Sequence, residues 1–267
     1  MSQEHKSLSP KIVEGVLKAG GWSPTEDDTM QRERLPHEFV KDLIQSYPSD
    51  KRSIGLLSLT LAAAKWGVED DGSLPDDPAD DAWRGPTRAS GKHLMSYLVG
   101  GVGLPHLDVG PLAKFIDYLV EQHSYIGSAS ERDFMATLAE GLRHKKVYDQ
   151  IKTDATFRKW MLQGLRRIEA QQWILEYWLT SFWEPAYNAS GADIRLAMIL
   201  ARIWNTRKDL GEFAAEKARQ AEPDQRVEAA LHAYAFNPKG NPDYERRRWG
   251  WMRRPVVLLD KYWSAAP

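Results

Sequence analysis

The apolar segment at residues 54–66 constrains the fold more than any other part of the chain. It reads Ile-Gly-Leu-Leu-Ser-Leu-Thr-Leu-Ala-Ala-Ala-Lys-Trp and is hydrophobic nearly all round if it forms a helix. A helix without a polar face is buried inside a protein or a membrane, and this segment is too short to span a bilayer. We therefore expect a central buried helix, capped by Ser53, and no membrane insertion.

Three acidic residues, Glu69, Asp70 and Asp71, follow this segment. The C-terminal end of a helix carries partial negative charge, which raises the pKa of a nearby carboxyl group. A carboxylic acid that stays protonated near neutral pH can donate its proton to the leaving oxygen of a glycosidic bond. The acids therefore form either a general-acid site or an ordinary solvated acidic loop.

A glycine-rich stretch lies at residues 100–108 and reads Gly-Gly-Val-Gly-Leu-Pro-His-Leu-Asp. Its spacing differs from the dinucleotide-binding fingerprint, so we expect Gly101 and Gly103 to form a tight turn or hairpin that lets a polymer lie close to the backbone. His106 and Asp108 point the same way if the chain is extended there. Alternatively, the acid caps a helix and the histidine is simply hydrogen-bonded. No further His or Glu sits at ligand spacing, so neither a metal nor another cofactor is expected.

Helical patterns dominate the rest of the chain and predict a mostly α-helical protein. Gly110-Pro111 and Asp154 begin two helical regions, of which Pro185 is expected to end the second, and residues 131–148 form another. Only the Val-Val-Leu-Leu run at 256–259 favours a strand. We expect a single domain over 1–267, made of N-terminal helices (1–50), a catalytic core (51–210), and C-terminal helices with an Arg/Trp-rich tail (211–267).

Composition excludes several classes of protein. The chain has no cysteine, which excludes disulfides, thiolate zinc sites and cysteine catalysis. A net charge of -1 lacks the positive surplus that phosphate neutralisation needs, so nucleic acid is not an expected partner. No apolar run follows the polar residues 1–6, so we expect synthesis in the cytoplasm without a Sec signal peptide.

The 11 tryptophans either fill an aromatic core or line a groove for a flat ligand. Trp160, Trp173 and Trp178 lie on helical patterns, which favours the core. Trp83 lies in a polar stretch rich in Asp, Pro and Gly, and is the better candidate for a substrate contact. The basic, aromatic tail at 244–254 either meets an anionic polymer or closes the fold with Arg stacked on Trp.

The order of these features resembles the lysozyme-like superfamily, whose nearest members are goose-type lysozymes, lytic transglycosylases and chitosanase-like enzymes. Those enzymes have one catalytic Glu at the end of a central helix, the position that Glu69 matches, and a glycine-containing turn that corresponds to residues 100–104. Their Ala-Tyr-Asn-Ala-Gly element has two partial matches, at 186–191 and 201–206. The usual Gly-Leu-Met-Gln is replaced here by Gly-Val-Gly-Leu-Pro-His-Leu-Asp, and the usual Glu-Ser pair by Glu-Asp. The resemblance covers residues 50–210.

This resemblance implies a lysozyme-like helical domain that cleaves the β-1,4 bonds of peptidoglycan or a related amino-sugar polymer, by hydrolysis or by transglycosylation. Glu69 would be the general acid, with Asp71 or Asp108 as base or electrostatic support. The residues predicted to contact the substrate are Trp83, Gly101, Gly103, His106, Tyr187, Asn188 and Asn205.

Such an enzyme without a signal peptide or cysteines suits a phage endolysin, or an antibacterial effector exported into the periplasm of a target cell. An immunity protein is then an expected partner. Two other functions stay open at this point. One is a non-catalytic helical adaptor that binds a protein partner through Trp-rich faces. The other is a nucleic-acid-binding protein that uses the Arg/Trp tail, which the near-neutral charge favours least.

Overall fold

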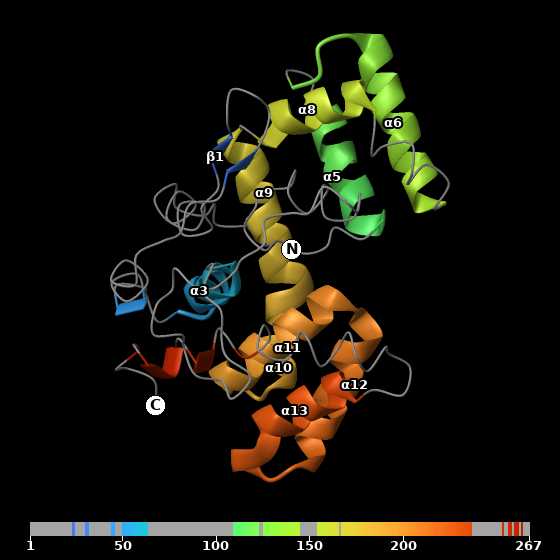
Figure 1. Ribbon diagram of the computed structural model, residues 1–267. Coiled ribbons are helices and arrows are strands. Elements are labelled where there is room, and N and C mark those ends of the chain that lie inside the picture. Colours follow the sequence, from blue (N-terminus) through green and yellow to red (C-terminus); the bar gives the residue numbers. More distant parts are fainter. Residues whose placement is uncertain are drawn as a thin grey trace, which may run out of the picture. The chain divides into compact units, whose positions relative to one another are not determined.

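Figure 1 shows the fold as a computed structural model of the chain. The residues that the structure describes are 23–24, 30–31, 44–45, 50–63, 109–122, 125–144, 154–165, 167–236, 253, 256–257, 259–261 and 263. These residues are mostly helical, which confirms the predicted fold class at that level. The lysozyme-like arrangement of the helices stays a prediction.

The chain divides into two compact units. Unit 1 comprises Met1–Arg32 and Arg84–Glu176, and unit 2 comprises Glu33–Trp83 and Tyr177–Pro267. The predicted core at 51–210 is therefore shared between the units. A single domain over 1–267 stays a prediction.

Unit 1 is built mainly from paired helices, of which α5 and α6 pack against each other. Phe115 and Leu119 of α5 and Leu138 of α6 are all buried. The predicted hairpin at 100–104 lies outside the described residues. The described elements of this unit are β1 (Ser23–Pro24) and β2 (Met30–Gln31), which pair antiparallel, α5 (Val109–Glu121), α6 (Ala129–Arg143), α8 (Ala155–Leu165) and the larger part of α9 (Ile168–Trp178).

Unit 2 is organised around α11, which packs against α10, α12 and α13 (Figure 1). Side chains 196–203 of this helix are all buried. Where α12 meets α11, a Cβ on Gly211 would lie 2.5 Å from Cγ of Trp204, so the indole packs directly on the α12 backbone. The described elements of this unit are α3 (Lys51–Ala63), the end of α9, the π-helical turn η1 (Leu179–Trp183), α10 (Glu184–Ala189), α11 (Ile194–Thr206), α12 (Lys208–Gln220), the 3-10 turn η2 (Pro223–Gln225) and α13 (Arg226–Ala235).

Several predictions about single elements are confirmed. A helix does begin beside Gly110-Pro111, and Asp154 does precede α8, where its Oδ1 accepts a hydrogen bond from the Phe157 N–H at 2.7 Å. Trp160 and Trp178 are buried in the core, as predicted, whereas Trp173 is half-buried.

Three local predictions are wrong. Ser53 does not cap α3, because the helix begins at Lys51 and the carboxylate of Asp50 caps it. Pro185 does not end the helical path, because it lies in the first turn of α10, where proline is tolerated. Residues 256–257 and 259 are helical. A helix satisfies its own backbone hydrogen bonds, whereas a lone strand needs a partner strand.

Candidate functional site

Helix α3 is the predicted central helix, and its described side chains confirm that it is buried. Residues 53–59 and 61 are all buried, including Leu56, Leu57 and Leu59, which point to different sides of the helix. A helix that is apolar nearly all round is stabilised by burial, so this position follows from its sequence, although burial also removes the Ser58 Oγ from water without a hydrogen-bond partner among the described residues.

The start of α3 is fixed by Asp50. Its Oδ1 accepts hydrogen bonds from the N–H groups of Arg52 and Ser53, both at 3.1 Å, and its Oδ2 accepts one from Ser53 Oγ at 2.5 Å. Partial burial raises the pKa of Asp50, but the hydrogen bonds from Ser53 and Arg52 outweigh it and leave the pKa below its usual value. Asp50 therefore stays ionised and holds the first turn of α3 in place.

The segment that follows α9 widens into a π-helical turn. The Glu184 N–H donates to the Leu179 carbonyl, five residues earlier. Pro185 lacks an N–H, and its ring crowds the carbonyl four residues before it in a regular α-helix. A wider turn before the proline relieves this crowding, and the chain then continues as α10.

This π turn brings two of the predicted substrate-contact residues to the start of α3. The Lys51 Nζ donates to Asn188 Oδ1 at 3.1 Å and lies 4.8 Å from the centre of the Tyr187 ring. The Tyr187 ring lies 5.7 Å from the Trp183 ring. Beside them, the Arg52 guanidinium forms an ion pair with Glu184 at 3.1 Å. We call Lys51, Tyr187 and Asn188 the Lys–Tyr–Asn cluster.

The sequence predictions include Tyr187 and Asn188 but not Lys51. The lysine and Asn188 are 137 residues apart in the chain, and no local pattern links a lysine at a helix start to a distant amide. The only sequence signal for this arrangement was Pro185. Its ring crowds the carbonyl four residues earlier, which predicts a distorted helix near residue 181.

Gly191 has a structural reason of its own within the partial match at 186–191. It follows the C-cap residue Ser190 with a φ of 69°, the left-handed conformation that glycine adopts without cost. The Gly191 N–H donates to the Asn188 carbonyl at 3.3 Å, and the Ala192 N–H to the Tyr187 carbonyl at 3.2 Å. These two bonds form a Schellman motif, which ends α10 and turns the chain toward α11.

Asn205, the third predicted substrate contact that the structure describes, is buried. It is 7% exposed on α11, and its Nδ2 has no hydrogen-bond partner among the described residues. An unpaired buried amide costs about 1–3 kcal/mol. The other predicted site residues lie outside the described part of the chain: Glu69, Asp71, Trp83, Gly101, Gly103, His106 and Asp108.

The Lys–Tyr–Asn cluster has the chemistry of a site for a polar, anionic ligand. Asn188 is exposed, and Lys51 and Tyr187 are half-buried. An ammonium carries three donors, of which Asn188 accepts one. The amide can exchange hydrogen bonds with a ligand, and the edge of the tyrosine ring offers an apolar contact. Such a group can hold a sugar that carries a carboxylate, but it contains no proton donor suited to cleave one.

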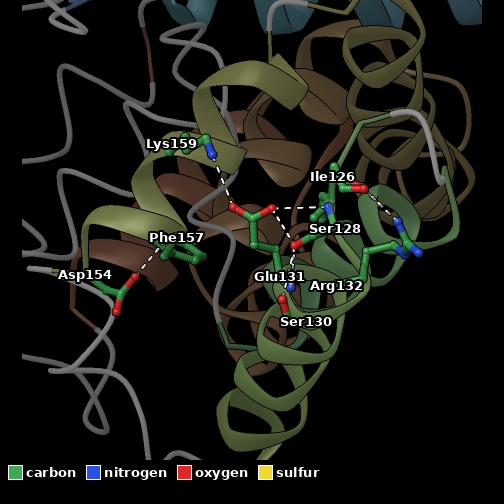
Figure 2. Close-up of polar contacts among 9 residues, drawn as sticks. Ile126, Ser128, Ser130, Glu131, Arg132, Asp154, Phe157 and Lys159 are labelled. Atoms are coloured by element: carbon green, nitrogen blue, oxygen red, sulfur yellow. Dashed lines mark hydrogen bonds and ion pairs between the residues drawn. The ribbon is translucent and has the colours of Figure 1, made fainter.

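A second polar cluster lies in unit 1 at the start of α6 (Figure 2). Glu131 Oε2 accepts hydrogen bonds from Ser128 Oγ at 2.8 Å and from the Ser128 N–H at 3.1 Å, while its Oε1 accepts one from Lys159 Nζ at 3.1 Å. The hydrogen bond from the Ser128 hydroxyl is the largest contribution that lowers the pKa of Glu131 to about 2. An acid with that pKa is ionised at neutral pH, so Glu131 cannot serve as a general acid there.

The described residues add two findings about the kind of site. They contain no group of three or more His, Cys, Asp or Glu side chains placed to hold a metal ion. No helix among them is both long enough and apolar enough to cross a membrane.

No protein-family model, curated protein or solved structure matches the chain.

Proposed function

We propose that this protein cleaves the β-1,4 glycosidic bonds of peptidoglycan or a related amino-sugar polymer, with Glu69 as the general acid. The observation that carries the proposal is the buried helix α3, whose first turn is held against Tyr187 and Asn188. The buried helix supports the proposal because the lysozyme-like enzymes that the sequence resembles place the catalytic Glu at the end of such a helix.

The position of Glu69 in the sequence supports its role. It comes six residues after Ala63, the last residue of α3. The proposal requires the chain after Ala63 to return the Glu69 carboxyl group to the C-terminal end of this buried helix, where the negative end of the helix dipole and the loss of hydration would raise its pKa. A raised pKa keeps the proton available for the leaving oxygen. Asp71 or Asp108 would then activate water for hydrolysis or stabilise the positive charge on the sugar.

The Lys–Tyr–Asn cluster would bind the polymer away from the cleavage point. The cluster contacts the first residue of α3, and the thirteen residues of this helix rise by about 18 Å from Lys51 to Ala63. A polysaccharide is a linear ligand, so one chain can contact groups that are separated by the length of a helix. In this proposal, Lys51 binds a carboxylate of the substrate and Asn188 an amide or hydroxyl group.

Delivery to the periplasm of a target cell, as an exported effector or a phage endolysin, belongs to the same proposal, and so does an immunity protein that protects the producer. The adaptor alternative gains less support. Trp160, Trp178 and Trp183 are buried, so these tryptophans offer no face to a protein partner.

The test is lysis of purified peptidoglycan, followed as loss of turbidity. The intact chain should lyse it and Glu69→Gln should not, because glutamine has the same shape but no acidic proton. Glu131→Gln is the matched control. It removes a half-buried acid that Lys159 and Ser128 keep ionised, and it should lyse peptidoglycan as the intact chain does. Equal lysis by the intact chain and Glu69→Gln would remove Glu69 from the acid role.

A further inference from the structure

An aromatic cluster in unit 1 joins α5 to the first half of α9 (Figure 1). The Trp173 ring stacks on the Tyr118 ring, with the ring centres 5.6 Å apart, and lies 5.4 Å from the ring of Phe115. The Tyr125 ring meets Tyr118 edge to face at 6.4 Å. Phe115 and Tyr125 are buried. Trp173 and Tyr118 are half-buried, so part of each of these two rings faces solvent.

Two phenols and a carboxylate form a hydrogen-bonded chain beside these rings. The Tyr125 hydroxyl donates to Glu169 Oε2 at 3.3 Å and accepts from the Tyr118 hydroxyl. Burial is the largest cause that raises the pKa of both phenols, so both keep their protons at neutral pH. The exposed carboxylate at the end of the chain is engaged through one oxygen only, because Oε1 of Glu169 has no hydrogen-bond partner among the described residues.

Arg167 brings a guanidinium to the same cluster without neutralising this carboxylate. Its Cζ lies 5.1 Å from the centre of the Tyr125 ring, within the range of a cation–π contact. Glu169 is only two residues away in the chain, yet exposed Arg167 forms no ion pair with any described residue. Elsewhere in unit 1, both oxygens of Glu140 are engaged by cationic neighbours on its own helix. Arg167 and Glu169 therefore keep several donors and one acceptor available beside the half-buried rings.

The spacing along α9 brings the carboxylate and the indole together. Glu169 and Trp173 are four residues apart, so they lie on the same face of the helix with their Cβ atoms about 5–6 Å apart. A ring-shaped ligand that packs on the indole can therefore reach the carboxylate.

A sugar ring suits this combination of groups. Its C–H groups pack on an aromatic face, and each of its hydroxyl groups both donates and accepts a hydrogen bond. One hydroxyl can thus donate to Glu169 while another accepts from Arg167. The charges of these two side chains cancel, which favours a neutral sugar over a phosphate or a polyanion.

We propose that unit 1 binds a neutral sugar unit of a glycan at this aromatic cluster. Trp173 and Tyr118 contact the apolar side of the sugar ring. Glu169 accepts hydrogen bonds from its hydroxyl groups, and Arg167 donates to them. This binding goes beyond the proposed function, because unit 1 can hold a glycan whether or not the chain cleaves it. The ligand also differs from that of the Lys–Tyr–Asn cluster in unit 2, whose ammonium suits a sugar that carries a carboxylate.

The test is titration of the intact chain with a soluble β-1,4-linked tetramer of N-acetylglucosamine. In heteronuclear NMR spectra, the indole N–H signal of Trp173 should move as the tetramer is added, and its absence from the spectrum of Trp173→Phe assigns it. Calorimetry should show that Glu169→Gln and Arg167→Ala each weaken binding about tenfold, the factor that separates a hydrogen bond to a charged group from a neutral one. Both side chains are exposed, so these variants should fold. Glu140→Gln is the matched control and should bind as the intact chain does.

The aromatic contact has a test of its own. Trp173→Phe keeps an aromatic face and should bind with nearly the affinity of the intact chain. Trp173→Leu keeps an apolar side chain but loses that face, so it should bind more weakly than Trp173→Phe. Thermal unfolding of both variants shows whether each is folded. Equal affinities of two folded variants would remove the indole from the site.

The outcomes separate this site from the proposed function. No binding of the tetramer would overturn the site, and so would binding that leaves the Trp173 signal in place, which is expected if only the Lys–Tyr–Asn cluster holds the sugar. Unchanged affinity in both Glu169→Gln and Arg167→Ala would overturn the roles of these side chains. Tighter binding of a galacturonic acid tetramer would contradict a neutral ligand. A chain that binds the tetramer at Trp173 but does not lyse peptidoglycan would refute the proposed function and support this site, and lysis without a moving Trp173 signal would do the reverse.

Discussion

The start of α3 in unit 2 and the start of α6 in unit 1 both hold a lysine ammonium 3.1 Å from a side-chain oxygen, that of Asn188 and that of Glu131 respectively. At α6 the acceptor belongs to a capping box, in which Ser128 and Glu131 bond each other across three residues. At α3 the acceptor lies 137 residues away and is brought there by buried indoles. The capping box at α6 depends only on residues of one helical turn. The contact between Lys51 and Asn188 depends on the buried side chains that hold α3 and α10 together.

The two regions also differ in what would disrupt them. The α6 cluster is exposed and charged, so its hydrogen bonds compete with water and salt. The α3 contact is backed by Trp178 and Trp183, which are fully buried. Nε1 of Trp178 donates to the Gly55 carbonyl at 3.0 Å, and Nε1 of Trp183 donates to the Lys51 carbonyl at 2.7 Å. We therefore expect substitutions behind α3 to change the stability of unit 2 strongly, and substitutions at the start of α6 to change the protein only slightly.

The largest effect is expected from Trp183→Ala. Truncation of a fully buried indole costs about 3–5 kcal/mol in transfer free energy and cavity formation, and here it also leaves the Lys51 carbonyl without its second donor. Denaturant unfolding should show this loss. Phe236→Ala is the control, since Phe236 is 40% exposed and its truncation should cost well under half as much. Equal losses would mean that the indole does not hold α3.

Gly55→Ala should come next. A Cβ at this position would lie 2.4 Å from Trp183 Cδ1, so a methyl group would overlap the buried ring, and overpacking costs about 1–3 kcal/mol. Alanine regains about 0.5–1 kcal/mol through its better helix propensity, so a net loss of about 1–2 kcal/mol is expected. Gly127→Ala provides the comparison, because its new Cβ would come no closer to a neighbour than 3.3 Å, the distance to Trp160 Cη2. A stabilised Gly55→Ala would contradict the close approach of the π turn to α3.

The two caps allow a like-for-like test. Asp50→Ala and Ser128→Ala each remove an N-cap side chain, which costs about 1 kcal/mol. Asp50 also bonds the Ser53 hydroxyl, so we expect Asp50→Ala to cost more than Ser128→Ala. Thermal unfolding of both variants would measure the order. A larger loss of stability in Ser128→Ala would mean that the capping box of α6 contributes more to stability than the Asp50 cap of α3.

Lowering the pH should change the stability of the intact chain relative to that of Glu131→Gln. The pKa of Glu131 in the folded protein, about 2, lies below its usual value of 4.5. Its ionised form therefore stabilises the fold above pH 4.5, and this contribution is lost as the pH falls toward 2. Glutamine keeps the capping box but does not titrate. The difference in melting temperature between the intact chain and Glu131→Gln should be small at pH 7 and vanish near pH 2. A difference that stays constant with pH would mean that the ionised carboxylate does not cause it.

Parts of the fold could be predicted from the sequence because their causes are local. The burial of α3 follows from a segment without a polar face, and the start of α8 follows from a capping Asp three residues before Phe157. The capping box of Ser128 and Glu131 is equally local, although its Ser-x-x-Glu pattern was not among the predictions. At α3 the predicted cap, Ser53, was wrong: Asp50, three residues earlier, caps the helix because its carboxylate accepts hydrogen bonds from two N–H groups.

The candidate site could be predicted from the sequence only in part. The sequence pointed to Tyr187 and Asn188, but Lys51 joins them through packing that depends on Gly55 and on the extra residue in the π turn. Neither is visible as a motif. Gly191 shows the opposite case: it belongs to the partial match with the Ala-Tyr-Asn-Ala-Gly element, but it ends α10 for reasons of backbone geometry.

The most direct measurement of the proposed function is mass spectrometry of purified peptidoglycan after incubation with the intact chain, Glu69→Gln and Glu131→Gln. We expect the intact chain and Glu131→Gln to release the same soluble sugar fragments, which carry reducing ends after hydrolysis or 1,6-anhydro ends after transglycosylation. Glu69→Gln should release none. Release of the same fragments by Glu69→Gln, or of none by the intact chain, would contradict a glycosidase in which the acid after α3 is catalytic.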